Sequence, residues 1–146
     1  RTYKEIKISK LEYSLNFIRM RNRYDPRFRE FQSKFLSSHD LDFFDLMGGE
    51  VALIKNIRVH DEEERGRGLG SRLLTNLCRQ FEDVDAIFLA ADVFESGSWL
   101  VDWYERHGFH VIQWDDGYPV MCRPSEALKM SLEFQEAMES GPELRA

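Results

Sequence analysis

The sequence predicts an α/β fold in which helices pack on a central sheet. Two apolar segments of strand type, Val51 to Val59 and Ala86 to Phe94, enclose a stretch with apolar residues at helical spacing. Helices that alternate with strands are typical of layered α/β folds. The chain has 146 residues, 42% of them hydrophobic, which suits one core. We therefore expect residues 1–146 to form a single domain.

The amino-terminal part is expected to begin with a strand and then a helix. Residues Tyr3 to Ile8 alternate polar and apolar side chains, as a half-buried strand does. Ser9 and Glu12 have the spacing of a capping box, which predicts a helix after them. The inner face of that helix would carry Leu11, Leu15 and Ile18.

A second helix is predicted to start at Asp25, an N-cap residue that is followed by Pro26 at the first helical position. The aromatic residues of this helix have helical spacing and are Phe28, Phe31 and Phe35. A loop over residues 37–42 and a short strand from Phe43 to Met47 would connect it to the strong strand at Val51.

The segment after Gly70 is predicted to be an amphipathic helix. Its apolar stripe consists of Leu69, Leu73, Leu77 and Phe81, widened by Leu74 and Cys78. A shorter helix should begin at Ser96 and end at Gly108, a residue suited to the left-handed position after a helix. One side of this helix would carry Trp99, Trp103 and Tyr104.

The last part of the chain is predicted to form a hairpin and a helix. Phe109 to Trp114 and Pro119 to Arg123 would be the strands of the hairpin, around a turn at residues 115–117. An amphipathic helix is expected over Ser125 to Glu139. Its inner face would carry Ala127, Met130, Phe134 and Met138.

The charge distribution favours a cationic partner over a nucleic acid. Through Phe35 the chain has ten Lys and Arg against four Asp and Glu, whereas the remainder has ten against twenty-two. An acidic body repels phosphates and attracts cations. The basic stretch from Arg19 to Arg29 fits either a solvated helix face or an anionic partner, and both interpretations remain open.

Composition also bears on the compartment. No apolar run approaches the length of about 20 residues that spans a bilayer, so we expect no membrane partner. The cysteines, Cys78 and Cys122, lack the spacing of metal ligands, so we expect free thiols and no metal. Free thiols are typical of a reducing compartment, which favours a cytoplasmic protein.

The glycines between the strand and the helix predict an anion site. Gly66, Gly68 and Gly70 leave a turn with little side-chain bulk, and the helix after them offers unpaired N–H groups and its positive dipole end. Such a turn suits a phosphate or diphosphate. The Gly-Lys-Ser/Thr ending of a P-loop is absent, and Ser71 occupies the third glycine position of the dinucleotide fingerprint. A solvated turn without a ligand would show the same glycines, so the pattern alone leaves both interpretations open.

Two motifs together resemble those of a known family. Arg65-Gly66-Arg67-Gly68-Leu69-Gly70 matches the R/Q-x-x-G-x-G/A motif of the GNAT acetyltransferases. Trp103 to Phe109, W-Y-E-R-H-G-F, is similar to a second motif of that family. The resemblance covers about residues 50–123 and implies a mixed, mainly antiparallel central sheet flanked by helices. The helix at 125–139 would be an addition that packs on the domain or joins a partner in a homodimer.

The resemblance also implies a site for acetyl-CoA. Turn and helix-start residues would bind the diphosphate of CoA, and these are Arg65, Gly66, Arg67, Gly68, Leu69, Gly70 and Ser71. The preceding strand would pair with the pantetheine arm through Ile57, Arg58 and Val59. An N–H group of this strand would polarise the thioester carbonyl.

Candidate catalytic residues follow from the same resemblance. Tyr104 matches the tyrosine that protonates the leaving thiolate, although it also fits a core aromatic position. Asp92, within the second apolar strand, is a candidate base whose burial would raise its pKa, or else a carboxylate at the strand end. Glu50, just before the first strand, is the second candidate base. His60 fits either a proton relay through water or a surface position.

The function implied is transfer of the acetyl group of acetyl-CoA to a primary amine. The acceptor would be a protein lysine, an amino terminus or a small cationic amine. Only Phe43 to Met47 is available as a strand ahead of Val51, where the family has two, so the amino-terminal half is expected to be shortened. A non-catalytic CoA-binding or interaction module is the alternative.

Overall fold

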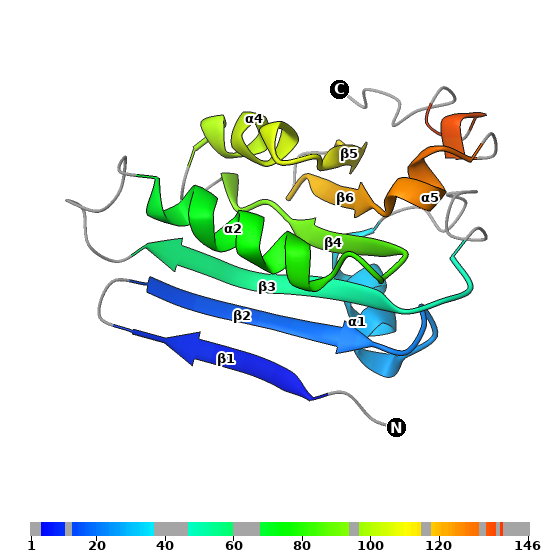
Figure 1. Cartoon of the computed structure of the whole chain (residues 1–146), viewed down its shortest axis with the longest axis horizontal. Coiled ribbons are helices and arrows are strands. Elements are labelled where there is room, and N and C mark those ends of the chain that lie inside the picture. Colours follow the sequence, from blue (N-terminus) through cyan, green and yellow to red (C-terminus); the bar gives the residue numbers. More distant parts are fainter. Residues whose placement is uncertain are drawn as a thin grey trace.

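The computed structural model describes residues 4–10, 13–36, 47–59, 68–93, 97–114, 118–131, 134–136 and 138. Its elements run in the order β1 (Glu5–Ser9), β2 (Tyr13–Met20), α1 (Pro26–Phe35), β3 (Val51–Val59), α2 (Leu69–Gln80), β4 (Ala86–Ala90), α4 (Trp99–Arg106), β5 (His110–Gln113), β6 (Val120–Pro124) and α5 (Glu126–Lys129). The strands form one six-stranded sheet that carries helices on both faces (Figure 1). The predicted α/β class is confirmed.

The strand order in the sheet is β1-β2-β3-β4-β6-β5. Only β3 and β4 are parallel; the other neighbouring strands are antiparallel. The expected mixed, mainly antiparallel sheet is therefore confirmed. The hairpin of β5 and β6 is also present, with His110 opposite Cys122, and β6 lies between β5 and β4.

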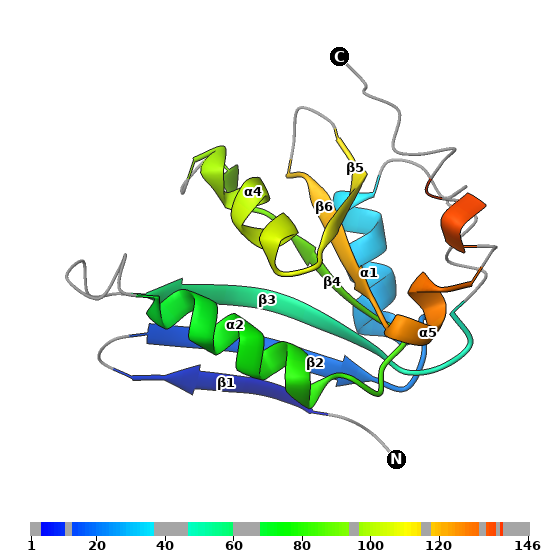
Figure 2. The ribbon, with the colours of Figure 1, turned by 45° about the horizontal axis from the view of Figure 1, so that its top comes forward.

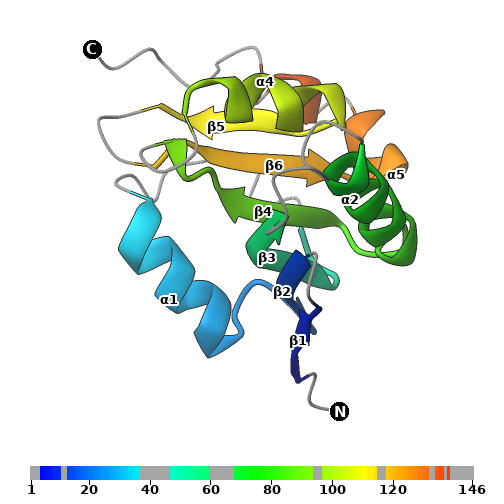
Figure 3. The same cartoon turned by 90° about the vertical axis from the view of Figure 1, so that its left-hand side faces the viewer.

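The sheet separates two hydrophobic cores. Figure 3 shows α1 on one face of the sheet, and α2 and α4 on the other. Alternation along a strand directs successive side chains to opposite faces. In β3, Ala52 and Ile54 therefore pack in the core beneath α2 and α4, whereas Val51 and Leu53 pack in the core beneath α1. We call these two sides the α2 face and the α1 face.

The helix expected after Ser9 is wrong, because residues 13–20 form strand β2. β2 pairs with β1 on one side and with β3 on the other. Leu15 and Phe17 are buried on the α2 face, and Ile18 and Met20 on the α1 face. A strand buried on both faces lacks a clear alternation of polar and apolar residues, so the helical spacing of its aliphatic residues was misleading.

The amino-terminal half is therefore not short of strands. β1 and β2 both precede β3 in the chain and lie beside it in the sheet. This corrects the expectation that Phe43 to Met47 supplies the only strand before Val51. Of that segment the structure describes Met47, which is buried, while residues 43–46 lie outside the described ranges.

Helix α1 begins as predicted. The Asp25 side chain accepts a hydrogen bond from the Arg27 backbone N–H at 2.9 Å, and Pro26 occupies the first helical position. Phe28 and Phe31 are buried on the α1 face, and Phe28 packs against Phe88 of β4 with ring centroids 4.9 Å apart. The aromatic spacing thus fixes α1 to the central strands.

Helix α4 ends in a Schellman motif. The N–H of Gly108 donates to the Glu105 carbonyl at 3.0 Å, and the N–H of Phe109 donates to the Tyr104 carbonyl at 3.2 Å. Gly108 has a φ of +89°, which favours glycine. The predicted helix end is confirmed, and the aromatic side chains adjoin one another as predicted, since Trp99 packs edge-on against Trp103 and Trp103 against Tyr104.

The carboxyl-terminal helix is interrupted. The Ser125 hydroxyl caps α5, whose last residue is Lys129. The Ser131 hydroxyl donates to the Leu128 carbonyl and accepts from the Phe134 N–H, so a new helical turn starts there. Phe134 is buried as expected, whereas Met130 is 72% exposed, which corrects its predicted inner position. Among the helices that the structure describes, none is long and apolar enough to cross a membrane.

Candidate functional site

Strands β3 and β4 separate partway along their length. Their pairing runs from Val51 opposite Ala86 to Leu53 opposite Phe88. β3 continues to Val59, and Figure 2 shows β4 and β6 turning away from it. The edge of β3 from Ile54 to Val59 is therefore not covered by β4. We call this part of the sheet, beyond Leu53 and Phe88, the divergence.

A β-bulge lies at the start of this uncovered edge. Asn16 pairs with Asn56 and Phe17 with Ile54, so Lys55 is an extra residue in β3. A bulge bends its strand and increases the local twist. Beyond it, Ile57 packs against the core of the α2 face. The strand predicted over Val51 to Val59 is thus confirmed, together with a bend that the sequence did not indicate.

Helix α2 begins at the same end of β3, as Figures 1 and 2 both show. Its N-cap residue is Gly68, with a φ of +83° and no side chain to bond the free amides. A Cβ built at Gly68 would have nothing within 4 Å among its surroundings. The N–H groups of Leu69, Gly70 and Ser71 open the helix, since the first helical bond runs from Arg72 N–H to the Gly68 carbonyl at 3.0 Å.

A hydrogen bond joins the start of α2 to α4. The indole Nε1–H of Trp103 donates to the Ser71 hydroxyl oxygen at 3.1 Å. Trp103 in turn packs edge-on against Tyr104, with ring centroids 5.0 Å apart. The second motif is therefore joined directly to the residue that follows the first motif, 32 residues away in the sequence.

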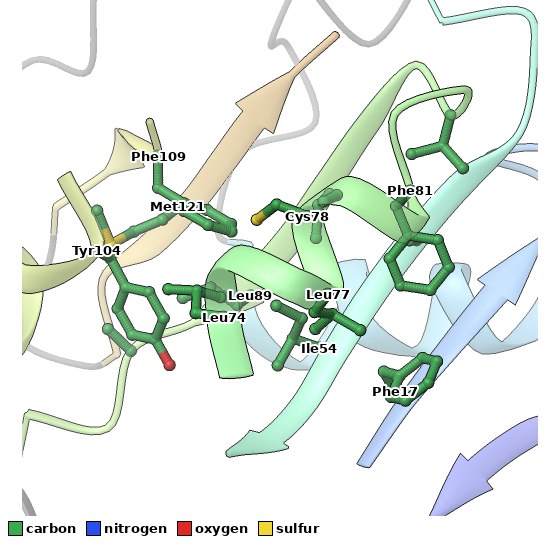
Figure 4. Packing of buried hydrophobic residues seen from close by; sticks show 14 of the residues in the cluster. Phe17, Ile54, Leu74, Leu77, Cys78, Phe81, Leu89, Tyr104, Phe109 and Met121 are labelled. Atoms are coloured by element: carbon green, nitrogen blue, oxygen red, sulfur yellow. The ribbon is translucent and has the colours of Figure 1, made fainter. Parts of the chain in front are cut away.

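Tyr104 lies in the core of the α2 face and is 5% exposed. Its ring packs edge-on against Phe109 at 5.5 Å, and Figure 4 shows its hydroxyl on the side away from Phe109. No hydrogen bond joins this hydroxyl to another described residue. Burial raises the pKa of the Tyr104 phenol above its usual range, so the hydroxyl keeps its proton at neutral pH.

Asp92 lies just past the end of β4. The strand ends at Ala90 rather than at Phe94 as predicted, and Asp92 is half-buried rather than enclosed by apolar neighbours. The Ala91 N–H donates to the Pro119 carbonyl at 2.8 Å, and the backbone then turns. Asp92 therefore lies just past the carboxyl end of β4, the strand that separates from β3 beyond Phe88.

Glu50 is not brought to this region. Its carboxylate accepts from Arg19 Nε at 3.2 Å, and Arg19 also pairs with Asp83. β3 has nine residues, so at about 3.3 Å per residue Glu50 stands about 30 Å from Val59. The geometry gives Glu50 a place in an ion-pair network that joins β2, β3 and the end of α2, and no contact with the other site candidates.

The structure describes some of the predicted site residues in β3 and the glycine turn, and others lie outside its described ranges. Ile57 is half-buried and Arg58 exposed in β3, and Val59 is its last residue. His60, Arg65, Gly66 and Arg67 lie outside the ranges that the structure describes. Within those ranges no group of three or more His, Cys, Asp or Glu side chains could hold a metal ion. The sequence did not predict the Trp103–Ser71 bond, although Trp103 lies in the second motif and Ser71 directly follows the first.

Comparison with known proteins identifies a family model. The model described as "Acetyltransferase (GNAT) family" matches residues 19–109, which is more than half of the chain. The match includes β3, the glycine turn, α2 and Tyr104. No curated protein matches the chain.

Solved structures match at low sequence identity. A bacterial toxin is 15% identical with a TM-score of 0.51, over 90% of this chain and 64% of its own. The histone acetyltransferase HPA2 and related acetyltransferase from Corynebacterium glutamicum ATCC 13032 is 21% identical, with a TM-score of 0.47, over 80% and 59%. PH1933 from Pyrococcus horikoshii OT3 is 22% identical, with a TM-score of 0.43, over 54% and 49%. The chain thus spans between about half and two thirds of the length of these structures, and the likeness to the toxin supports the fold alone.

Proposed function

Since the chain belongs to the acetyltransferase (GNAT) family, we propose that it transfers the acetyl group of acetyl-CoA to a primary amine. The observation that carries the proposal is the divergence of β3 from β4, with the start of α2 beside it. Members of this family use acetyl-CoA as co-substrate.

The residues at the divergence fit CoA. Gly68 leaves open space at the helix start, and the N–H groups of Leu69, Gly70 and Ser71 suit the diphosphate. The β3 edge around Ile57 offers main-chain groups to the amides of the pantetheine arm. Bound there, acetyl-CoA supplies an activated acetyl thioester. The backbone of this chain would hold it by hydrogen bonds that need no particular side chain.

Tyr104 and Asp92 would handle the protons. The amine nitrogen attacks the thioester carbonyl, a C–N bond forms, the C–S bond breaks and the thiolate leaves. Tyr104 donates its phenolic proton to that sulfur. Burial raises the pKa of the phenol, so the transient phenolate readily takes a proton back, and the net transfer is from the amine to the sulfur. Asp92, just past the end of β4, is the candidate that accepts the amine proton.

The acceptor is proposed to be cationic before it loses its proton. Beyond Phe35 the chain carries ten Lys and Arg against twenty-two Asp and Glu. Such a field raises the local concentration of cations and speeds their association. An ammonium must still be deprotonated to attack, which is why a base at the divergence matters.

Binding and turnover test the proposal together. Isothermal calorimetry should show that CoA and acetyl-CoA bind and that ATP binds far more weakly. Mass spectrometry should detect acetylated products when acetyl-CoA is supplied with lysine peptides or alkyl diamines. The absence of CoA binding would contradict the proposal.

Tyr104→Phe separates an enzyme from a pure binding module. In an enzyme the turnover should fall by about 10²-fold or more, because general acid catalysis contributes about that much. The affinity for CoA should stay unchanged. Tyr24→Phe is the matched control, because Tyr24 is 60% exposed and lies before α1. A wild-type protein that binds CoA but acetylates no amine would instead be a non-catalytic module.

A further inference from the structure

Two aromatic residues from distant parts of the chain meet on the α1 face. Phe35, the last residue of α1, packs edge-on against Tyr118, just before β6, with ring centroids 5.6 Å apart at 85°. Tyr118 is 38% exposed and Phe35 is half-buried. The pair therefore presents aromatic surface at the boundary between core and solvent.

A buried polar side chain holds this pair in place. Gln113 of β5 is 7% exposed, and its Nε2–H donates to the Phe35 carbonyl at 2.8 Å. A buried amide needs such partners, because a buried polar group without a hydrogen bond lowers the stability of the fold by about 1–3 kcal/mol. The bond ties the carboxyl end of α1 to the β5–β6 hairpin. Phe35 is thus held beside the hairpin, where its ring contacts that of Tyr118.

The aromatic pair borders the divergence. The hydrogen bond between Ala91 N–H and the Pro119 carbonyl, 2.8 Å long, continues the β4–β6 ladder by one step. Asp92 follows Ala91 at one end of that bond and Tyr118 precedes Pro119 at the other, so both residues lie next to it. Phe35 and Ala90 pack against the same core on the α1 face. Tyr104 and the start of α2 belong to the opposite face.

The ammonium group of Lys34 lies over the ring of Phe35. The Lys34 Nζ lies 5.2 Å from its centroid, within the range of a cation–π interaction. An aromatic face that binds this ammonium group can also bind the ammonium group of a ligand. The neighbouring carboxylate of Asp92 would favour the same charge.

We propose that Phe35 and Tyr118 bind the acceptor, and that they select a primary ammonium at the end of an unbranched alkyl stem. This inference rests on the proposed acetyl transfer. The stem packs against the two rings and the amine reaches the thioester from the α1 face, while CoA lies along β3 and α2. A lysine side chain and a free alkyl diamine share this chemistry, whereas an amine without a stem lacks it.

Steady-state kinetics with three acceptors test the selection. Nα-acetyl-lysine amide and 1,5-diaminopentane have the stem, and glycinamide does not. Phe35→Leu and Tyr118→Leu should each raise KM for the first two by roughly 3- to 30-fold, the range expected of a lost cation–π contact. Their kcat should change little. Tyr24→Leu is the control for the loss of a partly exposed tyrosine and should leave KM unchanged.

The two sources of the stem give different outcomes. If only Nα-acetyl-lysine amide is used, the acceptor is a lysine side chain, and if only 1,5-diaminopentane is used, it is a free diamine. Both outcomes support the proposal that the site selects an ammonium group on an unbranched alkyl stem. Equal use of glycinamide, or KM values unchanged in both aromatic variants, would overturn it.

A binding measurement separates this inference from the proposed function. Calorimetry of 1,5-diaminopentane with the CoA-loaded protein should show weaker binding in Phe35→Leu and recovery in Phe35→Tyr, which restores the ring. Lys34→Ala should tighten binding, because it removes a competing ammonium. If CoA fails to bind, the proposed function fails. Calorimetry of 1,5-diaminopentane with the protein without CoA then still tests whether Phe35 takes part in binding the diamine. Diamine binding that is undetectable, or equal in wild type and Phe35→Leu, contradicts the inference.

Discussion

Helices α1 and α2 begin in opposite ways. At α1 the Asp25 carboxylate accepts from the Arg27 backbone N–H, and its two oxygens also accept from Arg27 Nε at 2.9 Å and Nη2 at 2.8 Å. At α2 the N-cap residue is Gly68, which has no side chain. The positive end of the α1 dipole is thus matched by an anion of the chain itself, whereas that of α2 remains available to an external one.

The difference separates a structural helix start from a functional one. A side-chain cap stabilises its helix by about 1 kcal/mol. The left-handed glycine of α2 forgoes that gain and leaves open space where a Cβ would otherwise project. We infer that the start of α1 contributes to stability alone and that the start of α2 contributes to the affinity for CoA. Substitutions at the two helix starts can break or sharpen this inference.

The largest effect is expected for Gly68→Ala. The methyl group would enter the space proposed for the diphosphate, so the affinity for CoA should fall by about 10- to 100-fold, or about 1.4–2.7 kcal/mol. Calorimetry with CoA measures this loss. Gly108→Ala is the matched control, since Gly108 is also left-handed and its added Cβ would meet Arg123 Nε at 3.2 Å. Gly108→Ala should lower the free energy of unfolding more than Gly68→Ala does, and it should leave the affinity for CoA unchanged. A larger loss of CoA affinity in Gly108→Ala than in Gly68→Ala would contradict the inference.

A smaller effect is expected when the bond between α2 and α4 is removed. Ser71→Ala and Trp103→Phe each delete one neutral hydrogen bond, worth about 0.5–1.5 kcal/mol. The start of α2 would be held less firmly beside α4, so CoA affinity should fall by roughly 3- to 10-fold. The double variant should be no worse than either single one, as a double-mutant cycle would show. Additive losses would mean that the two residues act separately.

Asp25→Ala should leave CoA binding unchanged. Loss of the cap should lower the free energy of unfolding by about 1 kcal/mol, measured by urea denaturation. Calorimetry on the same variant supplies the second half of the comparison. A tenfold weaker affinity for CoA in this variant would show that the α1 start is not purely structural.

The smallest effect concerns pH. The hydrogen bond from Arg27 and its nearby charge hold the pKa of Asp25 below its usual value. A carboxylate with a depressed folded pKa stabilises the protein above its unfolded pKa of about 4, and the gain is lost as the pH falls through the folded pKa. Asp25→Asn keeps a capping oxygen but not the charge. Wild type should therefore be the more stable at pH 7, and the gap should narrow steadily as the pH falls below about 4. A gap that does not narrow in acid would exclude this ion pair as its cause.

Local signals in the sequence were sufficient for several elements. Asp25-Pro26 marks the start of α1 because the cap and the proline act on neighbouring residues. The unbroken β-branched and apolar run of β3, and the stripe through Leu74 and Leu77 of α2, are likewise local. The left-handed Gly108 was predictable from its place after a helix with basic residues in its last turn.

Other features depend on contacts that the sequence does not display. β2 is a strand because β1 and β3 pair with it on either side, although its capping box and aliphatic spacing favour a helix. The final helix is interrupted where the Ser131 hydroxyl bonds the Leu128 carbonyl. Residue spacing pointed to a continuous helix in both places, and hydrogen bonding decided otherwise.

The site was predictable in its residue types but not in its geometry. Gly68 and Tyr104 stand in recognisable motifs, whereas the divergence arises because β3 and β4 pair over only three residues. Glu50 directly precedes β3 in the sequence, but residue spacing does not reveal its ion pair with Arg19 of β2. The Phe35–Tyr118 contact joins residues far apart in the sequence, so no local pattern could reveal it.

Backbone amide hydrogen exchange with and without CoA tests the central claim most directly, because the proposed contacts are made by main-chain N–H groups. On addition of CoA, we expect slower exchange at Ile57 to Val59 and at Gly68 to Ser71, with no change at Arg27, whose N–H is already bonded to Asp25. Exchange that is unchanged at the start of α2 when CoA is bound, or protection centred on α1, would contradict the account.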